Sequence, residues 1–141
     1  MPSPVLDAPA AQVADSVPPA EAWALASSGQ AVLVDVRTPE ELAFVGRVPG
    51  AVNVPWATGT ALTRNPRFVR ELEHKLPDKS RRLLLLCRSG KRSALALEAA
   101  RKAGYAQASH VAEGFEGELD DQGRRGQQGG WRFHGLPWQQ D

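Results

Sequence analysis

The chain is poor in cysteine, with Cys87 as the single one among 141 residues. A single cysteine excludes an intrachain disulfide, and this usage is typical of proteins from a reducing compartment. It also excludes a second thiol in the chain that could resolve an oxidised or sulfur-loaded Cys87, so turnover at this residue needs an external acceptor. At this length one domain forms its own core without a disulfide or a metal ion, so we expect a single folded unit.

The chain also lacks an excess of charge and any long apolar run. Lys and Arg total 17 against 16 Asp and Glu, a net charge of +1, which favours neither a nucleic-acid nor a membrane partner. The apolar run 83–86 is flanked by charges and is far shorter than the roughly 20 residues that span a bilayer. Residues 1–12 contain no Lys or Arg and no sustained apolar stretch, so they do not resemble a secretory signal. We therefore expect a cytoplasmic protein.

Histidine is scarce as well. His74, His110 and His134 show no metal-ligand spacing and no partner motif, and we interpret each of them as a surface or packing residue. The histidines therefore predict no metal site, and we expect the protein to use no other cofactor.

Short apolar runs and helix signals alternate along the chain. The run 31–35 is typical of a strand buried on both faces of a parallel sheet, and Thr38-Pro39-Glu40-Glu41 is typical of a helix start. The alternation predicts an α/β fold with a mostly parallel central sheet and helices on both of its faces. The expected elements are a helix from 18 to about 28, a strand over 31–35, a helix from 39 to 46, a strand over 51–54, a helix after Asn65-Pro66, a strand ending at 86, a helix over 93–102 and a strand over 108–111. Residues 1–16, rich in Ala, Pro and Ser, are predicted to be a flexible lead-in to a domain spanning 17–141.

Cys87 stands where the central strand ends and a helix begins, in the segment Cys87-Arg88-Ser89-Gly90-Lys91-Arg92-Ser93. A strand that turns through a glycine into a helix directs backbone N–H groups and the positive helix end at the sulfur. Arg88, Lys91 and Arg92 add cationic charge to the same few residues. Thiolate is the nucleophilic form of cysteine, and a helix N-terminus beside cations favours it. The segment is therefore interpreted as an anion-binding loop around a reactive thiolate.

The alternative interpretation is an inert core residue. A lone cysteine after four leucines is, on that feature alone, more often a small buried hydrophobic side chain than a nucleophile. A packed thiol has no use for three cations and a turn glycine in the next five residues, which favours the reactive interpretation. In an open α/β sheet the ligand crevice lies at the carboxyl ends of the strands, and Cys87 follows such an end.

Several motifs, taken together in their order, resemble the rhodanese family of sulfurtransferases. They are Asp35-Val36-Arg37 with Glu41, the stretch 46–55, the loop 87–93, Glu113-Gly114-Phe115, Gly130-Trp131 and Gly135-Leu136-Pro137. The resemblance covers roughly 17–137 and implies a rhodanese-like domain. It implies a transferase in which Cys87 takes sulfane sulfur from thiosulfate or a similar small anionic donor as a persulfide. The sulfur then passes to cyanide, a thiol or a protein acceptor.

The resemblance also suggests roles for the residues near Cys87. The active-site loop would comprise Arg88, Ser89, Gly90, Lys91, Arg92 and Ser93. Arg88 and Lys91 are interpreted as substrate contacts, with solvated loop cations as the alternative. Arg92 either holds the loop through backbone carbonyls or faces the substrate, and the resemblance favours the structural role.

Asp35 and Arg37 are interpreted as supporting residues rather than catalytic ones. Asp35 ends a strand at the ligand-facing edge of the sheet. Arg37 lies four residues before Glu41, a spacing that allows an ion pair at the helix start.

The sequence departs from the family after Gly117. Relatives place a tryptophan directly after the Glu-Gly-Phe turn, whereas residues 118–130, rich in Gly, Arg and Gln, come before Trp131 here. We interpret this stretch as an inserted loop, either a surface excursion or a segment that recruits an acceptor through Arg124 and Arg125.

Two other functions stay open. A non-catalytic rhodanese-like sulfur carrier or interaction module would use the same fold, although such modules commonly lose the cysteine. An arsenate reductase or phosphatase of a related fold would carry five residues between the cysteine and the arginine of its loop. Here four residues separate Cys87 from Arg92, which gives a tighter ring that suits a single sulfur atom better than a tetrahedral phosphate.

Overall fold

A five-stranded parallel sheet forms the centre of the computed structural model, which describes residues 13–59, 62–117, 121–122 and 129–140. The strand order is β1-β7-β6-β2-β3, and every neighbouring pair in it is parallel. The strands are β1 (Ser16–Val17), β2 (Val32–Asp35), β3 (Val52–Asn53), β6 (Leu83–Leu86) and β7 (Ala108–Val111). A separate antiparallel pair consists of β4 (Ala57–Thr58) and β5 (Thr63–Arg64).

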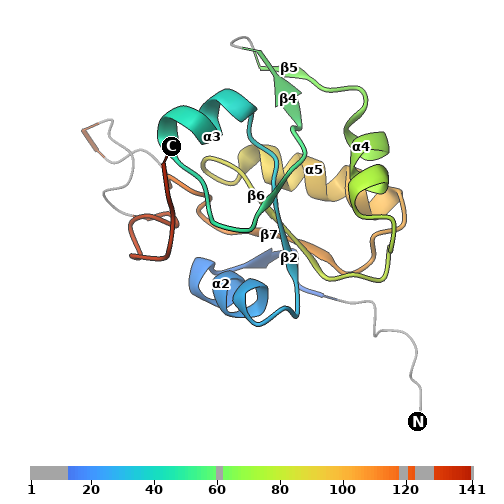
Figure 1. The fold of residues 1–141 in the computed structure, drawn as a ribbon, viewed down its shortest axis with the longest axis horizontal. Helices are drawn as coiled ribbons and strands as arrows, with labels where there is room; N and C mark the ends of the chain where they lie inside the picture. The colour runs from blue at the N-terminus through green and yellow to red at the C-terminus, as the bar shows by residue number, and fades with distance from the viewer. Residues whose placement is uncertain (1–12, 60–61, 118–120, 123–128, 141) are drawn as a thin grey trace.

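Helices cover both faces of the sheet, as Figure 1 shows. They are α2 (Pro19–Ser27), α3 (Pro39–Val45), α4 (Phe68–Lys75) and α5 (Lys91–Lys102). Side chains of α4 and α5 pack with one face, whereas Ala22 of α2 packs with the other. The α/β fold with a parallel sheet that the sequence predicts is therefore confirmed.

The leucines of β6 explain why this strand is central. All four are fully buried, because the strand has neighbours on both edges and helices on both faces. Successive side chains of a strand point to opposite faces, so Leu83 and Leu85 join the core under α4 and α5, while Leu84 and Leu86 join the core under α2. A continuous apolar run is the pattern that this environment demands.

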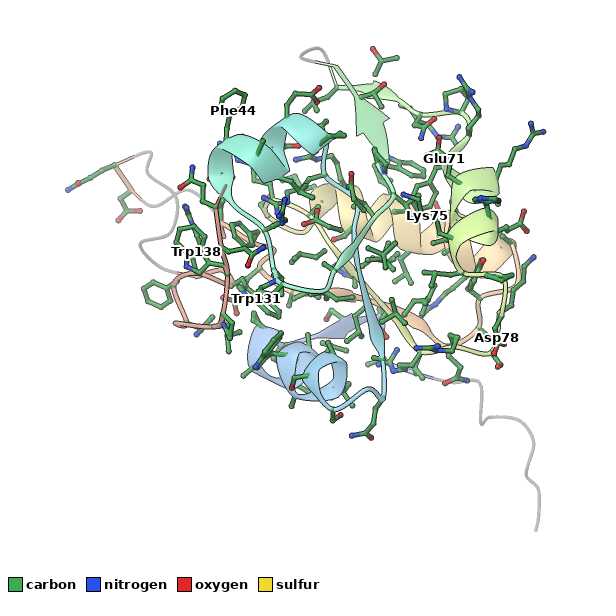
Figure 2. All side chains as sticks on the ribbon, viewed as in Figure 1. Phe44, Glu71, Lys75, Asp78, Trp131 and Trp138 are labelled. Atoms are coloured by element: carbon green, nitrogen blue, oxygen red, sulfur yellow. The ribbon has the colours of Figure 1, made fainter. Side chains whose placement is uncertain are left out.

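The C-terminal segment closes the second core. Trp131 is fully buried, meets Trp23 of α2 edge to face with ring centroids 6.0 Å apart, and donates its Nε1–H to the carbonyl of Pro137 at 2.8 Å. Figure 2 shows Trp131 inside the molecule, between α2 and the last part of the chain. A buried indole is stabilised by apolar contact only if its N–H finds an acceptor, and both conditions hold here.

Some element boundaries differ from those predicted. Helix α5 begins at Lys91 rather than at residue 93, and α4 begins at Phe68. Asn65 does not cap α4, because its side-chain oxygen accepts from the N–H of Arg67 and so forms a turn before the helix. Strands β1, β4 and β5 have two residues each, too few to give a periodic signal in the sequence.

The predicted lead-in lies partly within the described residues. Arg101 pairs with Asp15 at 2.6 Å, and Ser109 Oγ donates to the carbonyl of Ala14, so residues 14–16 contact α5 and β7. Residues 1–12 lie outside the described part of the chain, as does most of the predicted insertion, including Arg124 and Arg125.

Among the described residues, none of the helices combines the length and the apolar composition that a membrane span requires.

Candidate functional site

Cys87 follows β6 directly, at the edge of the sheet where the parallel strands end. The chain then turns within three residues and enters α5 through Gly90, whose φ of 108° lies in the region that favours glycine. This turn brings the N–H of Gly90 to 3.1 Å from Cys87 Sγ and the hydroxyl of Ser93 to 3.3 Å from the same sulfur. The sulfur therefore sits at the N-terminal end of a helix of 12 residues, in the positive field that this end creates.

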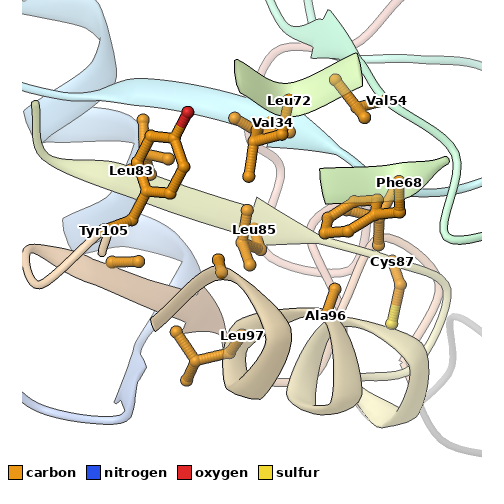
Figure 3. Close-up of a cluster of buried hydrophobic side chains, with 13 residues drawn as sticks. Val34, Val54, Phe68, Leu72, Leu83, Leu85, Cys87, Ala96, Leu97 and Tyr105 are labelled. Atoms are coloured by element: carbon orange, nitrogen blue, oxygen red, sulfur yellow. The ribbon is translucent and has the colours of Figure 1, made fainter. Parts of the chain in front are cut away.

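The thiol is buried but borders a cavity. Only 1% of Cys87 is exposed, and on one side it packs with Phe68 and Ala96, as Figure 3 shows. On another side it lines a cavity of about 340 Å³. The cavity is lined by Trp56, Ala57, Leu62, Arg64, Cys87, Arg88, Ser89, Lys91, Arg92 and Leu95. Cys87 thus packs in the hydrophobic core on one side and lines the cavity on another.

Cations dominate the polar lining of this cavity. Arg88, Lys91 and Arg92 come from the loop and the start of α5, as the sequence predicts, and Arg64 of β5 adds a fourth. Within the described residues, no Asp or Glu lines it. Seven residues that the sequence brings into one loop thus meet at one place: five line the cavity, and Gly90 and Ser93 contact the sulfur. Cations that line one cavity create a positive potential that attracts small anions.

The far wall of the cavity was not predicted from the sequence. Trp56, Leu62 and Arg64 come from the region of β4 and β5, and the guanidinium of Arg64 lies 4.9 Å from the centre of the Trp56 ring. Strands β4 and β5 are too short to leave a periodic signal in this part of the sequence, so only the folded chain reveals this wall.

The turn after β7 holds the loop in place. The N–H of Phe115 donates to the carbonyl of Cys87 at 2.7 Å, and the N–H of Glu116 donates to that of Arg88 at 2.9 Å. The carboxylate of Glu116 also pairs with Arg88 at 3.1 Å, although the Arg88 side chain stays 47% exposed. Gly114 makes this approach possible, since a Cβ there would lie 2.5 Å from the Arg88 carbonyl group. These contacts explain Gly114 and Phe115 of the motif by the packing of this turn against the loop.

Arg92 has a structural role, but its partner is a carboxylate and not the backbone carbonyls of the loop that the sequence analysis expects. Its guanidinium forms two hydrogen bonds with the carboxylate of Glu41, at 2.7 and 2.8 Å, and so ties the start of α5 to the start of α3. The predicted ion pair between Arg37 and Glu41 is therefore wrong, because Arg92 takes the carboxylate. Glu41 also completes a capping box at the predicted start of α3, accepting from the N–H of Thr38 while Thr38 Oγ1 accepts from the N–H of Glu41.

The charges around Glu41 change its titration. Burial on its own would raise the pKa of Glu41, but the hydrogen bonds from Arg92 and from the Thr38 backbone, with the charges of Arg92 and Arg37, outweigh burial and lower the pKa below 4.5. The same pair raises the pKa of Arg92. A carboxylate whose pKa is lower in the folded protein stabilises the fold above its ordinary pKa, and this contribution is lost as the pH falls through the lowered value.

A Glu41→Gln variant is expected to lose about 2 kcal/mol of unfolding free energy at neutral pH, because it removes a charge-assisted pair. Because the stabilisation by the Glu41 carboxylate is lost at low pH, the difference in unfolding free energy between the variant and wild type should shrink as the pH falls below 4.5 and the carboxylate is protonated. Urea unfolding at pH 7 and near pH 3 measures both values. Glu40→Gln, an exposed neighbour on the same helix turn, serves as the control. A difference that is equal at both pH values would contradict this account of the pair.

Asp35 and Arg37 form a second pair, deep under the loop. Both side chains are fully buried, and Arg37 donates to the two carboxylate oxygens of Asp35 at 2.7 to 3.2 Å and to the carbonyl of Gly46 at 2.9 Å. The guanidinium carbon also lies 4.3 Å from the centre of the Phe115 ring. Neither residue lines the cavity beside Cys87, so the pair joins the end of β2, the end of α3 and the turn that holds the loop.

The three histidines differ in their surroundings. His74 is exposed, and His134 lies 2.8 Å from a carboxylate oxygen of Glu113. His110 of β7 is half-buried, and its Nδ1 lies 3.2 Å from Ser93 Oγ, the hydroxyl that also contacts Cys87. The packing interpretation of His110 thus missed a link to the loop, and no motif in the sequence could have revealed it. Among the described residues, no group of His, Cys, Asp and Glu has the arrangement of a metal site.

The chain is similar to known proteins of one family. The family described as Rhodanese-like domain matches residues 18–119. The Mus musculus protein named "Thiosulfate sulfurtransferase/rhodanese-like domain-containing protein 3" is 36% identical over 98 residues, which span 68% of this chain and 62% of the mouse protein. The Homo sapiens protein named "Thiosulfate:glutathione sulfurtransferase" is 36% identical over 105 residues, or 71% of this chain and 89% of the human protein. The crystal structure of Rv0390 from M. tuberculosis matches with a TM-score of 0.81 and 42% identity, covering 92% of this chain and all of that one.

Proposed function

The chain belongs to the rhodanese family, and on this premise we propose that it moves sulfane sulfur from thiosulfate, or a similar anionic donor, to a thiophilic acceptor through a persulfide on Cys87. One observation carries the proposal: Cys87 Sγ accepts from the Gly90 N–H at 3.1 Å and borders a cavity whose charged lining is entirely cationic among the described residues. The family and the names of the mouse and human relatives support a sulfurtransferase-type enzyme. The donor and the acceptor are part of the proposal.

The reaction would proceed in two displacements at sulfur. In the first, the thiolate of Cys87 attacks the outer sulfur of thiosulfate, a new S–S bond forms, and the old S–S bond breaks with its electron pair leaving on sulfite. In the second, cyanide or a thiolate attacks the outer sulfur of the persulfide, and the Cys87 thiolate leaves. The two steps balance without a cofactor or an external oxidant.

The cavity suits the charges in the first step. Thiosulfate and sulfite are dianions, and the approach of a dianion to a thiolate brings together negative charges. Arg88, Lys91 and Arg64 line the cavity with opposite charge, while the N–H of Gly90 stabilises the sulfur itself. Trp56, Leu62 and Leu95 supply apolar parts of the other walls.

Two rival functions would use the same family fold or a related one. A non-catalytic module would not need an anion-binding cavity beside an intact cysteine. A phosphatase or arsenate reductase needs a loop that encloses a tetrahedral oxyanion, whereas here four residues separate Cys87 from Arg92, and Arg92 is engaged with Glu41. Reductase chemistry also calls for a resolving thiol, which this chain does not contain. Hydrolysis of an aryl phosphate is the assay that would favour the phosphatase.

Mass spectrometry of the intact protein tests the proposal. After incubation with thiosulfate, we expect the protein to gain the mass of one sulfur atom, and a subsequent addition of cyanide should remove it as thiocyanate. Sulfate, a dianion of similar size without sulfane sulfur, is the matched control and should add nothing. If neither thiosulfate nor any other sulfane donor loads the protein, the binding module becomes the better proposal.

A further inference from the structure

Cys87, Ser93 and His110 form a line of three groups that leads away from the cavity. Ser93 Oγ lies 3.3 Å from Cys87 Sγ and 3.2 Å from His110 Nδ1, and Ser93 is fully buried. The hydroxyl also donates to the carbonyl of Gly90 at 3.2 Å, and by rotation its single proton can turn from that carbonyl to His110 Nδ1. Because a serine hydroxyl has one proton and can accept from two donors, it can link the thiol to the imidazole.

His110 borders a second cavity. This cavity measures about 380 Å³ and is lined by Asp15, Ala94, Leu97, Glu98, Arg101, Lys102 and His110. Among the described residues it shares none with the lining of the cavity beside Cys87. The alternation of β7 explains the position of His110, since it lies on the same face of the strand as Ala108, the face that α5 covers. The imidazole thus stands between the buried hydroxyl of Ser93 and a second hollow of the surface.

We propose that His110 receives the thiol proton of Cys87 through the hydroxyl of Ser93, and that it releases this proton on the side of the second cavity. This inference deepens the proposed function, because it states how the thiolate forms. In the starting state the Cys87 S–H donates to Ser93 Oγ, and the Ser93 O–H donates to Nδ1 of a neutral His110. One proton passes from Sγ to Oγ while another passes from Oγ to Nδ1. The products are a thiolate and an imidazolium, so the total charge of the three groups does not change.

The surroundings of His110 suit a proton acceptor. Burial lowers the pKa of His110 below 6.5 and the nearby charge of Arg101 lowers it further, while Asp15 acts in the opposite direction. A lowered pKa keeps the imidazole neutral at pH 7 and so able to accept a proton. The same burial and the charge of Arg101 disfavour the imidazolium, so His110 holds the proton only briefly and passes it on to the side of the second cavity. The charged groups that line its cavity are Asp15 on the β1 side and Glu98, Arg101 and Lys102 on α5, while Leu85 pairs with it from β6.

The pH profile of Cys87 alkylation tests the inference. Iodoacetamide is suitable because it is neutral and reacts with the thiolate, so the cavity cations do not steer it. We expect His110→Asn to react about tenfold more slowly than wild type near pH 6, equivalent to a displacement of about one pH unit. The two rates should converge at high pH, where hydroxide takes the thiol proton directly. Asparagine retains a hydrogen-bonding group near the position of Nδ1 but cannot take up a proton.

Two further variants show whether His110 acts through Ser93. Combining His110→Asn with Ser93→Ala should slow alkylation no more than Ser93→Ala does alone, because the serine carries the link. His74→Asn, which changes an exposed histidine of α4, should leave the profile unchanged. An alkylation rate of His110→Asn equal to that of wild type at pH 6, or slowed by the same factor at every pH, would overturn the inference, since uniform slowing marks a structural defect.

A second measurement leaves His110 intact. NMR titration of its imidazole should show two steps in wild type, because the thiol and the imidazole titrate as a coupled pair, and one step in Cys87→Ser. The same single step in both proteins would also overturn the inference. Neither measurement depends on sulfur transfer, so loading by thiosulfate reports separately on the proposed function.

Discussion

The Cys87→Ser variant is expected to lose sulfur transfer from thiosulfate to cyanide by about 10⁴-fold or more, since it removes the atom on which the persulfide forms. A serine hydroxyl fits the same space and can keep the hydrogen bonds to Gly90 and Ser93 that the structure gives to the sulfur. The loss should therefore fall on the chemistry and not on the fold. Steady-state formation of thiocyanate measures it.

Two controls separate chemistry from folding in this variant. Thermal unfolding should stay close to that of wild type, because the two side chains have similar size. Binding of sulfite to the variant, measured by calorimetry, should persist, since the cations that line the cavity are unchanged. Thiocyanate production at a rate near that of wild type would show that sulfur does not pass through Cys87.

The second large effect is expected at the buried pair under the loop. Asp35→Ala should lower the free energy of unfolding by about 3–5 kcal/mol, because it leaves the Arg37 guanidinium buried without its counter-charge. Arg37 is fully buried, and its Nη1 already has no hydrogen-bond partner among the residues that the structure describes, so these offer no evident substitute for the carboxylate. Denaturant unfolding at neutral pH measures the loss.

An exposed pair of the same residue types provides the control. Asp15 and Arg101 also form an ion pair, but the Asp15 side chain is 80% exposed, so Asp15→Ala should cost less than about 1 kcal/mol. Replacing both buried partners, as Asp35→Leu with Arg37→Met, should recover much of the loss, because no charge then stays unpaired. A cost for Asp35→Ala no greater than that for Asp15→Ala would mean that Arg37 reaches solvent or another acceptor.

Local signals predicted the elements that bear the site. The four leucines before Cys87 indicated a strand covered on both faces, and the structure buries all four. Thr38, Pro39 and Glu41 indicated a helix start, and the structure has the expected cap there. These predictions succeed because burial pattern and capping depend on residues close together in the chain.

Partners that lie far apart in the sequence could not be predicted in the same way. The spacing of Arg37 and Glu41 allowed an ion pair, but Arg37 is held by Asp35 and Glu41 binds Arg92, which is 51 residues away. Helical spacing shows only which pairs are possible, and burial of Arg37 beneath the loop decided the outcome. The rhodanese resemblance itself is confirmed by the family match over residues 18–119.

The sequence by itself determined that a thiol follows a buried strand, that a glycine turn and a helix come next, and that cations gather within the same loop. Tertiary structure alone decided that Trp56 and Arg64 form the opposite wall, that Glu41 holds Arg92, and that His110 lies beside Ser93. The physical reason is that a loop's conformation follows from its own residues, whereas its neighbours are set by the register of parallel strands that are distant in the chain.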